Sequence, residues 1–228
     1  MKKIKLILIT ALAVIATKLS SQNIFFPTKV GTTLTFVQKD DKGEITGYTR
    51  QTITKVDGSG ENMTISYLYE SMDEQKNVVI AVPCEMVIKN DVMIFDVKHV
   101  FVGQLKDANE KLGDVTGTPL KFPNNLAPEQ SIDDAHLNAA VHKGILTIHV
   151  KVDMTNGKCV AIEDLHVPAG TFKSHKILQD VTTTMLGKTN HQHVFSWGAH
   201  DIGIVKMVTN NNDGSLHNTV ELIEIKNN

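Results

Sequence analysis

The histidines are the residues of this chain whose type and spacing come closest to a chemical site. The sequence contains ten of them. His191 and His193 are two positions apart, so their imidazoles would share one face of a strand, and His200 follows shortly after. A transition-metal site needs a further ligand in a fixed geometry, and the stretch "TNHQH" is typical of a polar hairpin tip. We therefore expect no metal site and no cofactor.

Groups for nucleophilic or acid–base catalysis are not arranged in a recognisable motif. A serine hydrolase of the elbow type needs Gly-x-Ser-x-Gly, whereas residues 57–61 read "DGSGE", which is typical of a hairpin turn. Asp133 and Asp134 are adjacent, so on a strand they would point to opposite faces and could not act as a couple. No phosphate-loop, dinucleotide or zinc-protease motif occurs. We predict no catalytic residue.

Cys84 and Cys159 are the two thiols of the chain. Disulfides persist in exported proteins, so the two residues could pair if the chain leaves the cytoplasm. Pairing requires that their Cα atoms come within reach, which the sequence does not establish. The alternative is two buried free thiols that pack as small hydrophobic groups. Both alternatives stay open at this point.

The N-terminus has the three parts of a secretory signal peptide. Lysines occupy positions 2, 3 and 5, an apolar run covers residues 6–16, and Ser20 and Ser21 precede Gln22. A membrane span needs about 20 apolar residues, more than this run contains. We predict a signal peptide over residues 1–22, no transmembrane span in the mature chain, and export to the periplasm, the cell surface or the extracellular space.

The composition is that of a globular protein without a nucleic-acid partner. Hydrophobic residues make up 41% of the 228 residues, and the formal net charge is -2. Nucleic-acid binding depends on basic patches, whereas the basic residues here are interleaved with acidic ones.

Short runs with apolar and polar residues in alternation fill most of the chain, and this period of two predicts β-strands. In residues 146–154, for example, Ile148, Val150 and Val152 fall on one face and polar residues on the other, as in an antiparallel sheet. Asn156-Gly157 follows, and this pair predicts a two-residue hairpin turn. The other expected strands cover residues 32–38, 45–56, 63–72, 78–88, 92–102, 202–209 and 217–225.

We predict a mainly all-β fold, a curved antiparallel meander sheet that forms a half-open or flattened β-barrel. Residues 103–142 are the least regular part and are expected to contain an irregular or short helical connector, although 132–141 favours a strand. Strand patterns on both sides favour one domain over residues 23–228. A division into two lobes near residue 115 is the alternative.

The stretch "VPAG" at residues 167–170 predicts a hairpin turn. Pro168 fixes its own φ near -65°, Val167 before it is biased towards extended geometry, and Gly170 can adopt positive φ. The stretch therefore ends one strand and reverses the chain into the next. It contains neither a nucleophile nor an acid–base pair.

This hairpin, with "FSWGAHDIGIVKM" at residues 195–207, resembles the TapB-like families of domains of unknown function, which are exported proteins common in Bacteroidota. His200 and Asp201 replace the Pro-Gly usual in the family, and a different shape is expected for that turn. The resemblance implies a curved antiparallel sheet and no particular activity. The matching residues are Val167, Pro168, Ala169, Gly170, Thr171, Phe172, Lys176, Ile177, Trp197, Ala199, Ile202, Gly203, Val205 and Lys206.

Three hypotheses for function follow. The first is a non-catalytic exported protein that binds an apolar, lipid-like ligand or another envelope protein on a concave β surface, with residues 103–130 as a candidate cover. The second is a structural or assembly component that pairs through an edge strand. The third is a hydrolase that uses scattered His and Asp residues. Trp197, the only tryptophan, is expected to anchor the core, with a ligand-lining role as the alternative.

Overall fold

The computed structural model describes residues 24–95, Phe101 and 110–227. The predicted signal peptide and residues 102–109 of the connector lie outside the described residues. The described residues form 14 β-strands. The strands are β1 (Thr33–Asp40), β2 (Ile45–Ser59), β3 (Asn62–Met72), β4 (Val78–Lys89), β5 (Val92–Phe95), β6 (Glu110–Thr118), β7 (Lys121–Pro123), β8 (Ser131–Ile132), β9 (Ala135–Lys143), β10 (Leu146–Val167), β11 (Gly170–Met185), β12 (Lys188–Ala199), β13 (Gly203–Asn211) and β14 (Leu216–Lys226).

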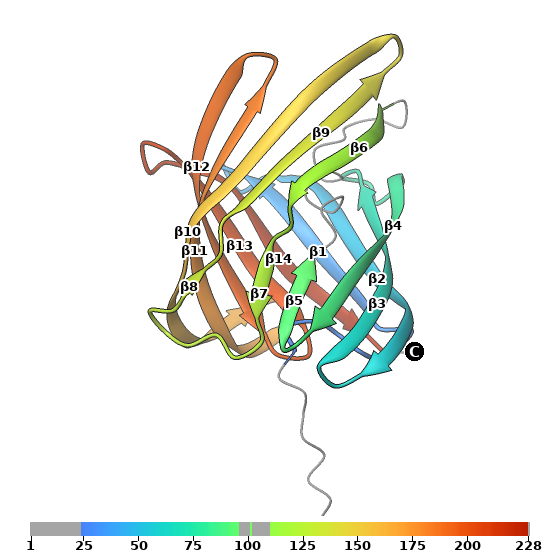
Figure 1. The fold of residues 1–228 in the computed structure, drawn as a ribbon, viewed down its shortest axis with the longest axis vertical. Helices are drawn as coiled ribbons and strands as arrows, with labels where there is room; N and C mark the ends of the chain where they lie inside the picture. Colours follow the sequence, from blue (N-terminus) through green and yellow to red (C-terminus); the bar gives the residue numbers. More distant parts are fainter. Residues whose placement is uncertain (1–23, 96–100, 102–109, 228) are drawn as a thin grey trace, which may run out of the picture.

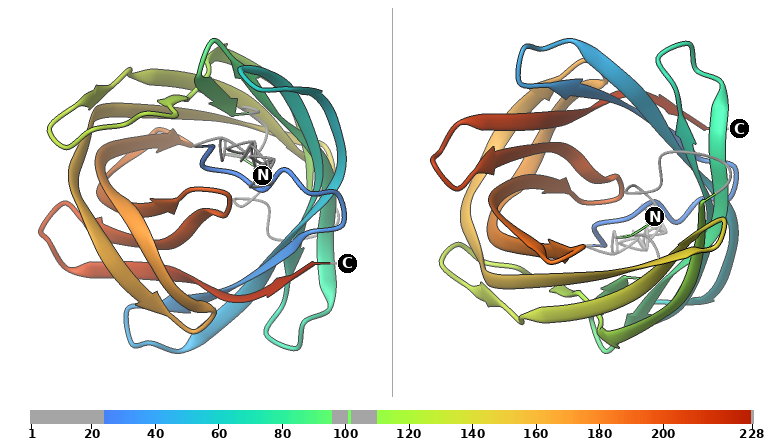
Figure 2. Two further views of the ribbon diagram at one scale, coloured as in Figure 1. Left: turned by 90° about the horizontal axis from the view of Figure 1, so that it is seen from below. Right: turned by 90° about the horizontal axis from the view of Figure 1, so that it is seen from above.

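All strands belong to one antiparallel sheet, which curls into a ring (Figures 1 and 2). The order is β6-β9-β10-β11-β12-β13-β14-β1-β2-β3-β4-β5-β7, and β8 pairs with β10 beside this path. The ends of the path, β6 and β7, are not paired with each other, so the barrel is half open as the sequence predicted. Residue 115, where two lobes could have divided, lies within β6.

The lower core fills the ring with side chains that alternate along the strands. In β3, for example, Met63, Ile65, Tyr67 and Tyr69 are all buried, while the residues between them are less so. Burial of each large apolar side chain contributes about 1.5–3 kcal/mol. The lower core consists of Ile24, Phe25, Phe26, Ile53, Met63, Ile65, Tyr67, Tyr69, Cys84, Met86, Ile88, Met93, Phe122, Leu126, Ile132, Cys159 and Ile177. Because these residues come from facing strands, they point to the inside of the ring.

The upper core is formed by residues of β9 and β10 together with Phe101, and Leu112 and Val115 of β6 pack against it. It consists of Phe101, Ala135, Leu137, Ala139, Val141, Val150, Val152 and Met154. The predicted strand over 132–141 is thus confirmed as β9. Residues 103–130 were expected to cover the inner face. Of their described part, β6 and β7 are strands of the sheet itself, whereas Leu126, in the loop after β7, is buried in the lower core.

The predicted hairpin turn at Asn156-Gly157 was wrong. Asn156 has the expected positive φ of 55°, but β10 continues through it as a bulge in the pairing with β11. The bulge makes room for β8, because a Cβ at Gly157 would lie 3.0 Å from Cβ of Ile132. Gly157 pairs with Ile132, so a contact distant in sequence overrides the local turn signal.

The "VPAG" stretch joins β10 to β11. Val167 pairs with Gly170, which leaves Pro168-Ala169 as a two-residue loop, and Gly170 has a φ of 143°. The amide of Ala169 donates a hydrogen bond to the carbonyl of Leu222 in β14 at 3.2 Å. The end of this hairpin therefore curls back onto the sheet, and Val167 and Leu222 are buried in one cluster with Trp197.

Candidate functional site

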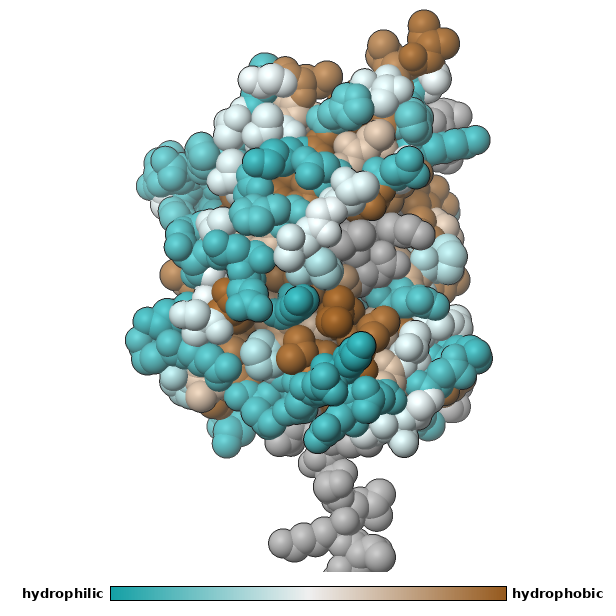
Figure 3. All heavy atoms as spheres, viewed as in Figure 1, coloured by the Kyte–Doolittle hydropathy of each residue, from teal (hydrophilic) through white to brown (hydrophobic). Residues whose placement is uncertain are grey.

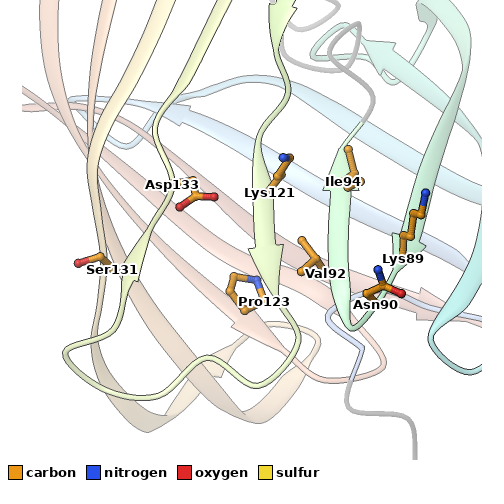
Figure 4. Close-up of a pocket in the computed structure, with 8 residues that line it drawn as sticks. All are labelled: Lys89, Asn90, Val92, Ile94, Lys121, Pro123, Ser131 and Asp133. Carbon is orange, nitrogen blue, oxygen red and sulfur yellow. The ribbon is translucent and has the colours of Figure 1, made fainter.

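The candidate site is a groove at the seam of the ring, where β7 and β8 lie beside each other without strand pairing (Figure 4). We call it the seam groove. It has a volume of about 330 Å³, near the lower end of the 300–1,000 Å³ typical of small-molecule sites. Its lining residues are Lys89, Asn90, Val92, Ile94, Lys121, Pro123, Ser131 and Asp133.

The β4–β5 turn sets one wall of the seam groove. Asn90 and Asp91 both have positive φ, 51° and 62°, as a two-residue hairpin loop requires. The Asp91 carboxylate accepts hydrogen bonds from the side-chain amides of Asn124, at 3.1 Å, and Asn125, while the Asp91 carbonyl accepts the amide of Asn124 at 2.9 Å. These bonds clamp the end of β7 to the β4–β5 turn.

The groove floor is apolar because β5 carries apolar residues on both of its faces. Met93 points into the lower core and is buried, whereas Val92 and Ile94 point the other way and are half-buried. A strand that is apolar on both faces is normally covered on both. Figure 3 shows hydrophobic atoms exposed among hydrophilic ones at this front of the molecule. The described residues therefore cover the outer face of β5 only in part.

The rim of the groove carries two lysines. Lys89 ends β4 and is exposed, and Lys121 begins β7 and is half-buried. Within residues 24–95, 101 and 110–227, neither ammonium forms an ion pair. Asp133 also lines the groove, on the side of Lys121 that is away from Lys89 (Figure 4). The arrangement suits a molecule with an apolar body and an anionic group.

Trp197 does not line the seam groove; it anchors a different part of the fold. Its Nε1 donates a hydrogen bond to Oε1 of Glu163 at 2.6 Å. The Lys176 ammonium lies 5.1 Å from the centre of its ring, a distance typical of cation–π contact. The indole is 8% exposed. Gly203 pairs with Ala199 at the start of β13, and Val167, Trp197 and Ala199 are buried in one cluster.

The histidines that the sequence singled out are engaged with neighbouring strands. Nδ1 of His191 is hydrogen-bonded to Oγ1 of Thr182 at 3.0 Å, and Nδ1 of His193 to Oδ1 of Asp180 at 2.7 Å. Asn156 and His193, in that order, lower the pKa of Asp180 through their hydrogen bonds. Among the residues that the structure describes, no three His, Cys, Asp or Glu side chains could hold a metal ion.

His175 belongs to an aromatic cluster inside the ring. Its ring centre lies 4.8 Å from that of Phe25 and 5.1 Å from that of His200, and Phe25 stacks on His200 at 4.2 Å. Burial lowers the pKa of His175, and the neighbouring His200 and Lys173 lower it further. His175 is consequently neutral when packed.

The buried imidazole of His175 predicts acid-dependent stability. A pKa lowered by folding means that the unfolded chain binds the proton first, so the stability that neutral His175 contributes is complete above about pH 6.5 and is lost as the pH falls through the lowered pKa. We expect the urea concentration at the midpoint of unfolding to be lower at about pH 5.5 than at about pH 7.5. His175→Gln should show a smaller fall. Equal falls in both proteins would assign the pH dependence to other groups.

The two cysteines are buried in the lower core and are not joined by a disulfide. The Cys84 thiol lies 3.8 Å from the carbonyl of Val82, and that of Cys159 lies 3.6 Å from the carbonyl of Ala161. Burial raises the pKa of Cys159.

Sequence reasoning missed the seam groove. Lys89 and Lys121 carry no motif, and they flank the same strand only because β5 pairs with both β4 and β7. The single local signal was the stretch "VMIF" at residues 92–95, whose apolar side chains occupy both faces of one strand.

Comparison with known proteins places the chain among domains of unknown function. The model of the DUF3108-like family matches residues 29–222. A crystal structure of a protein described as exported, with a YmcC-like fold, from Bacteroides fragilis superposes with a TM-score of 0.77 at 19% identity, over 89% of this chain and 99% of that one. A protein described as a lipoprotein, from Parabacteroides distasonis, gives 0.77 at 18% identity, over 89% and 98%.

These identities show a shared fold and no more. Among curated proteins, none matches this sequence. Within the described part of the chain, no helix has the length and the apolar character needed to cross a membrane.

Proposed function

Because the chain belongs to the DUF3108-like family and shares the fold of proteins described as exported or as lipoproteins, we propose that it is an exported, non-catalytic binding protein. It holds an amphipathic, lipid-like ligand with an anionic group in the seam groove. The observation that carries this proposal is the apolar floor of Val92, Ile94 and Pro123 beneath the ammonium groups of Lys89 and Lys121.

Burial and charge both favour such a ligand. A ligand that covers Val92 and Ile94 removes apolar surface from water at both partners. Lys121 is half-buried without an ion-pair partner among the described residues, so an anionic head group would gain a charge-assisted contact there. The residues that resemble the TapB-like families, Val167–Phe172 and Trp197, have a structural role in this proposal: they hold the curled sheet in shape. Ligand binding is assigned to the seam groove alone.

The non-catalytic part of the proposal is supported by how the histidines are used. The described His–Asp pairs, His136–Asp153 at 2.8 Å and His193–Asp180 at 2.7 Å, link neighbouring strands. Both histidine side chains are more than one third exposed. Such pairs suit cross-strand stabilisation better than chemistry in a water-excluded site.

An assembly role through β6 is the second candidate. Among the described strands, β6 pairs only with β9, so Glu110–Thr118 presents a free edge. However, its pairing with β9 is interrupted by a bulge between Leu112 and Val115, and bulges are a device that blunts edge strands against pairing. The geometry therefore favours the seam groove.

Displacement of a fluorescent fatty acid by laurate tests the seam groove. We expect saturable binding by the wild type and a loss of affinity of about tenfold, or about 1.4 kcal/mol, in Lys121→Glu. Lys42→Glu, in the exposed β1–β2 loop, makes the same change in net charge and should bind as the wild type does. A neutral alcohol of the same chain length should bind Lys121→Glu and the wild type alike. Equal laurate affinity in both lysine variants would contradict the proposal.

A further inference from the structure

We propose that the tips of the β9–β10 and β11–β12 hairpins dock this protein onto the surface of an anionic lipid bilayer. The two hairpins project side by side from one end of the ring, beyond its other loops (Figure 1). We call these two ends the projecting tips. The inference rests on the projecting tips alone and does not depend on a ligand in the seam groove.

Both projecting tips expose large apolar side chains to solvent. In the β9–β10 tip, Ile145 is 102% exposed and Leu146 60% exposed; in the β11–β12 tip, the values are 45% for Met185 and 70% for Leu186. Figure 3 shows the uppermost corner of the molecule as hydrophobic. Two neighbouring tips with this character are unusual for a soluble surface, where exposed apolar residues are scattered singly.

The loop of the β11–β12 tip has a leucine where its backbone conformation disfavours one. Met185 pairs with Lys188, which leaves Leu186-Gly187 as the loop. Leu186 has a φ of 51° and Gly187 one of 73°, so the loop has the geometry in which Asn-Gly is preferred and a leucine is strained. A strained residue that also exposes its apolar side chain gains nothing for the fold, which points to a use outside it.

The charge around the projecting tips is positive. Segments 139–150 and 181–192 contain no Asp or Glu, and each contains one lysine, Lys143 and Lys188. In the described sheet, Glu110 of β6 is paired with Lys143, so Lys143, Lys188 and Glu110 together keep one net positive charge. Apolar tips flanked by lysines complement a surface that is apolar inside and anionic at its head groups.

The other hairpin loops at the same end have the opposite character. The β1–β2 loop reads "DDKGE" at residues 40–44, the β3–β4 loop contains Asp73 and Glu74, and the β13–β14 loop contains Asp213. Anionic lipid would repel these loops. The positive, apolar character is thus confined to the two hairpins that project.

Hydrogen-bonding side chains lie immediately behind the projecting tips. His142 is bonded to Thr147, His191 to Thr182, and Thr184 to Thr189, at 3.0, 3.0 and 3.1 Å. These polar groups suit the depth of lipid head groups, with the apolar tips reaching further into the bilayer. The order from tip to base is therefore apolar, then polar and basic, as in segments that lie in a membrane interface.

The shape of the projecting tips favours a bilayer over a folded protein partner. A stable protein interface buries about 800 Å² on each side with complementary shape, and two narrow tips do not present such an area. A bilayer deforms around a narrow tip and requires no matching surface. Two tips instead of one add their contributions, because the second inserts at high effective concentration once the first has bound.

Sedimentation with vesicles tests the inference. The exported full-length chain is mixed with phosphatidylcholine vesicles that do or do not contain phosphatidylglycerol. The wild type should bind the anionic vesicles. Ile145→Asp combined with Leu186→Asp should reduce the partition coefficient at least about tenfold, because burial of one large apolar side chain changes an equilibrium by such a factor. The control, Val30→Asp with Ile162→Asp, changes two exposed apolar residues elsewhere and should bind as the wild type does.

Leu186→Asn separates membrane docking from any structural role of the tip. Asparagine tolerates positive φ better than leucine, so this variant should unfold at a higher temperature than the wild type while binding vesicles more weakly. Lys188→Gln should weaken binding to anionic vesicles and leave binding to neutral vesicles unchanged. Lys121→Glu, in the seam groove, should not change vesicle binding or its loss in the tip variants. If the seam groove proves to bind no ligand, the inference about the projecting tips is therefore unaffected.

Two results would overturn the inference. One is wild-type protein that stays in the supernatant with anionic vesicles at low salt. The other is vesicle binding that the Ile145 and Leu186 substitutions leave unchanged. If the wild type instead forms dimers that Ile145→Asp dissociates, the projecting tips contact a second copy of this chain and not a membrane.

Discussion

Trp197→Ala is expected to lower the free energy of unfolding by about 3–5 kcal/mol, the usual loss for a buried Trp truncated to Ala. The indole is buried in one cluster with Val167 and Leu222, so its removal leaves a cavity where the β10–β11 hairpin curls back onto β14. The Lys176 ammonium also loses the ring that it covers. Urea unfolding, followed by far-ultraviolet circular dichroism, measures the loss.

Trp197→Phe is the matched control for this prediction. Phenylalanine keeps an aromatic ring beneath Lys176 but cannot donate the hydrogen bond to Glu163. We expect a loss of about 1–2 kcal/mol from the hydrogen bond and the smaller volume. Glu163 is exposed, so water can satisfy its carboxylate. If the alanine variant were as stable as the phenylalanine variant, the packing role assigned to Trp197 would be wrong.

Gly117→Ala is expected to destabilise the protein by about 3 kcal/mol, or to unpair β6 from β9. A Cβ at this position would lie 1.9 Å from the backbone carbonyl oxygen of His136, and Gly117 has a φ of 126°. Residues other than glycine are strained at this φ by about 1–3 kcal/mol, and a backbone atom cannot rotate away as a side chain can. Amide hydrogen exchange in β9 would report local unpairing, and urea unfolding would report the global loss.

Gly113→Ala is the matched control within the same strand. A Cβ there would meet the His142 imidazole at 2.7 Å, which is the end of a side chain that can move. Its φ also lies outside the range that disfavours alanine. This substitution should therefore cost less than Gly117→Ala. Similar losses in both would show that the close approach of β6 and β9 at Gly117 is not as described.

The strands were predictable because one face of each is buried and period-two alternation records that face directly. The run at 63–72 became β3 (Asn62–Met72), and the run at 217–225 became β14 (Leu216–Lys226). The turn at Pro168-Ala169 was predictable for a related reason. Its backbone requirements fall on residues that are adjacent in the sequence.

The misread features depend on contacts between distant residues. Asn156-Gly157 carries a strong local turn signal, yet its geometry serves the packing of Ile132, which lies 25 positions before Gly157 in the numbering. The seam groove depends in the same way on which strands end the curled sheet. The strand patterns fix the faces of β5 but do not determine that its outer face stays uncovered.

Methyl NMR of the protein during titration with laurate tests the central claim most directly. The account predicts saturable shifts of the Ile94 and Val92 methyl signals, while those of Val150 and Val152 in the upper core stay in place. Shifts confined to methyl groups outside the seam groove, or no shifts at laurate concentrations below micelle formation, would contradict it.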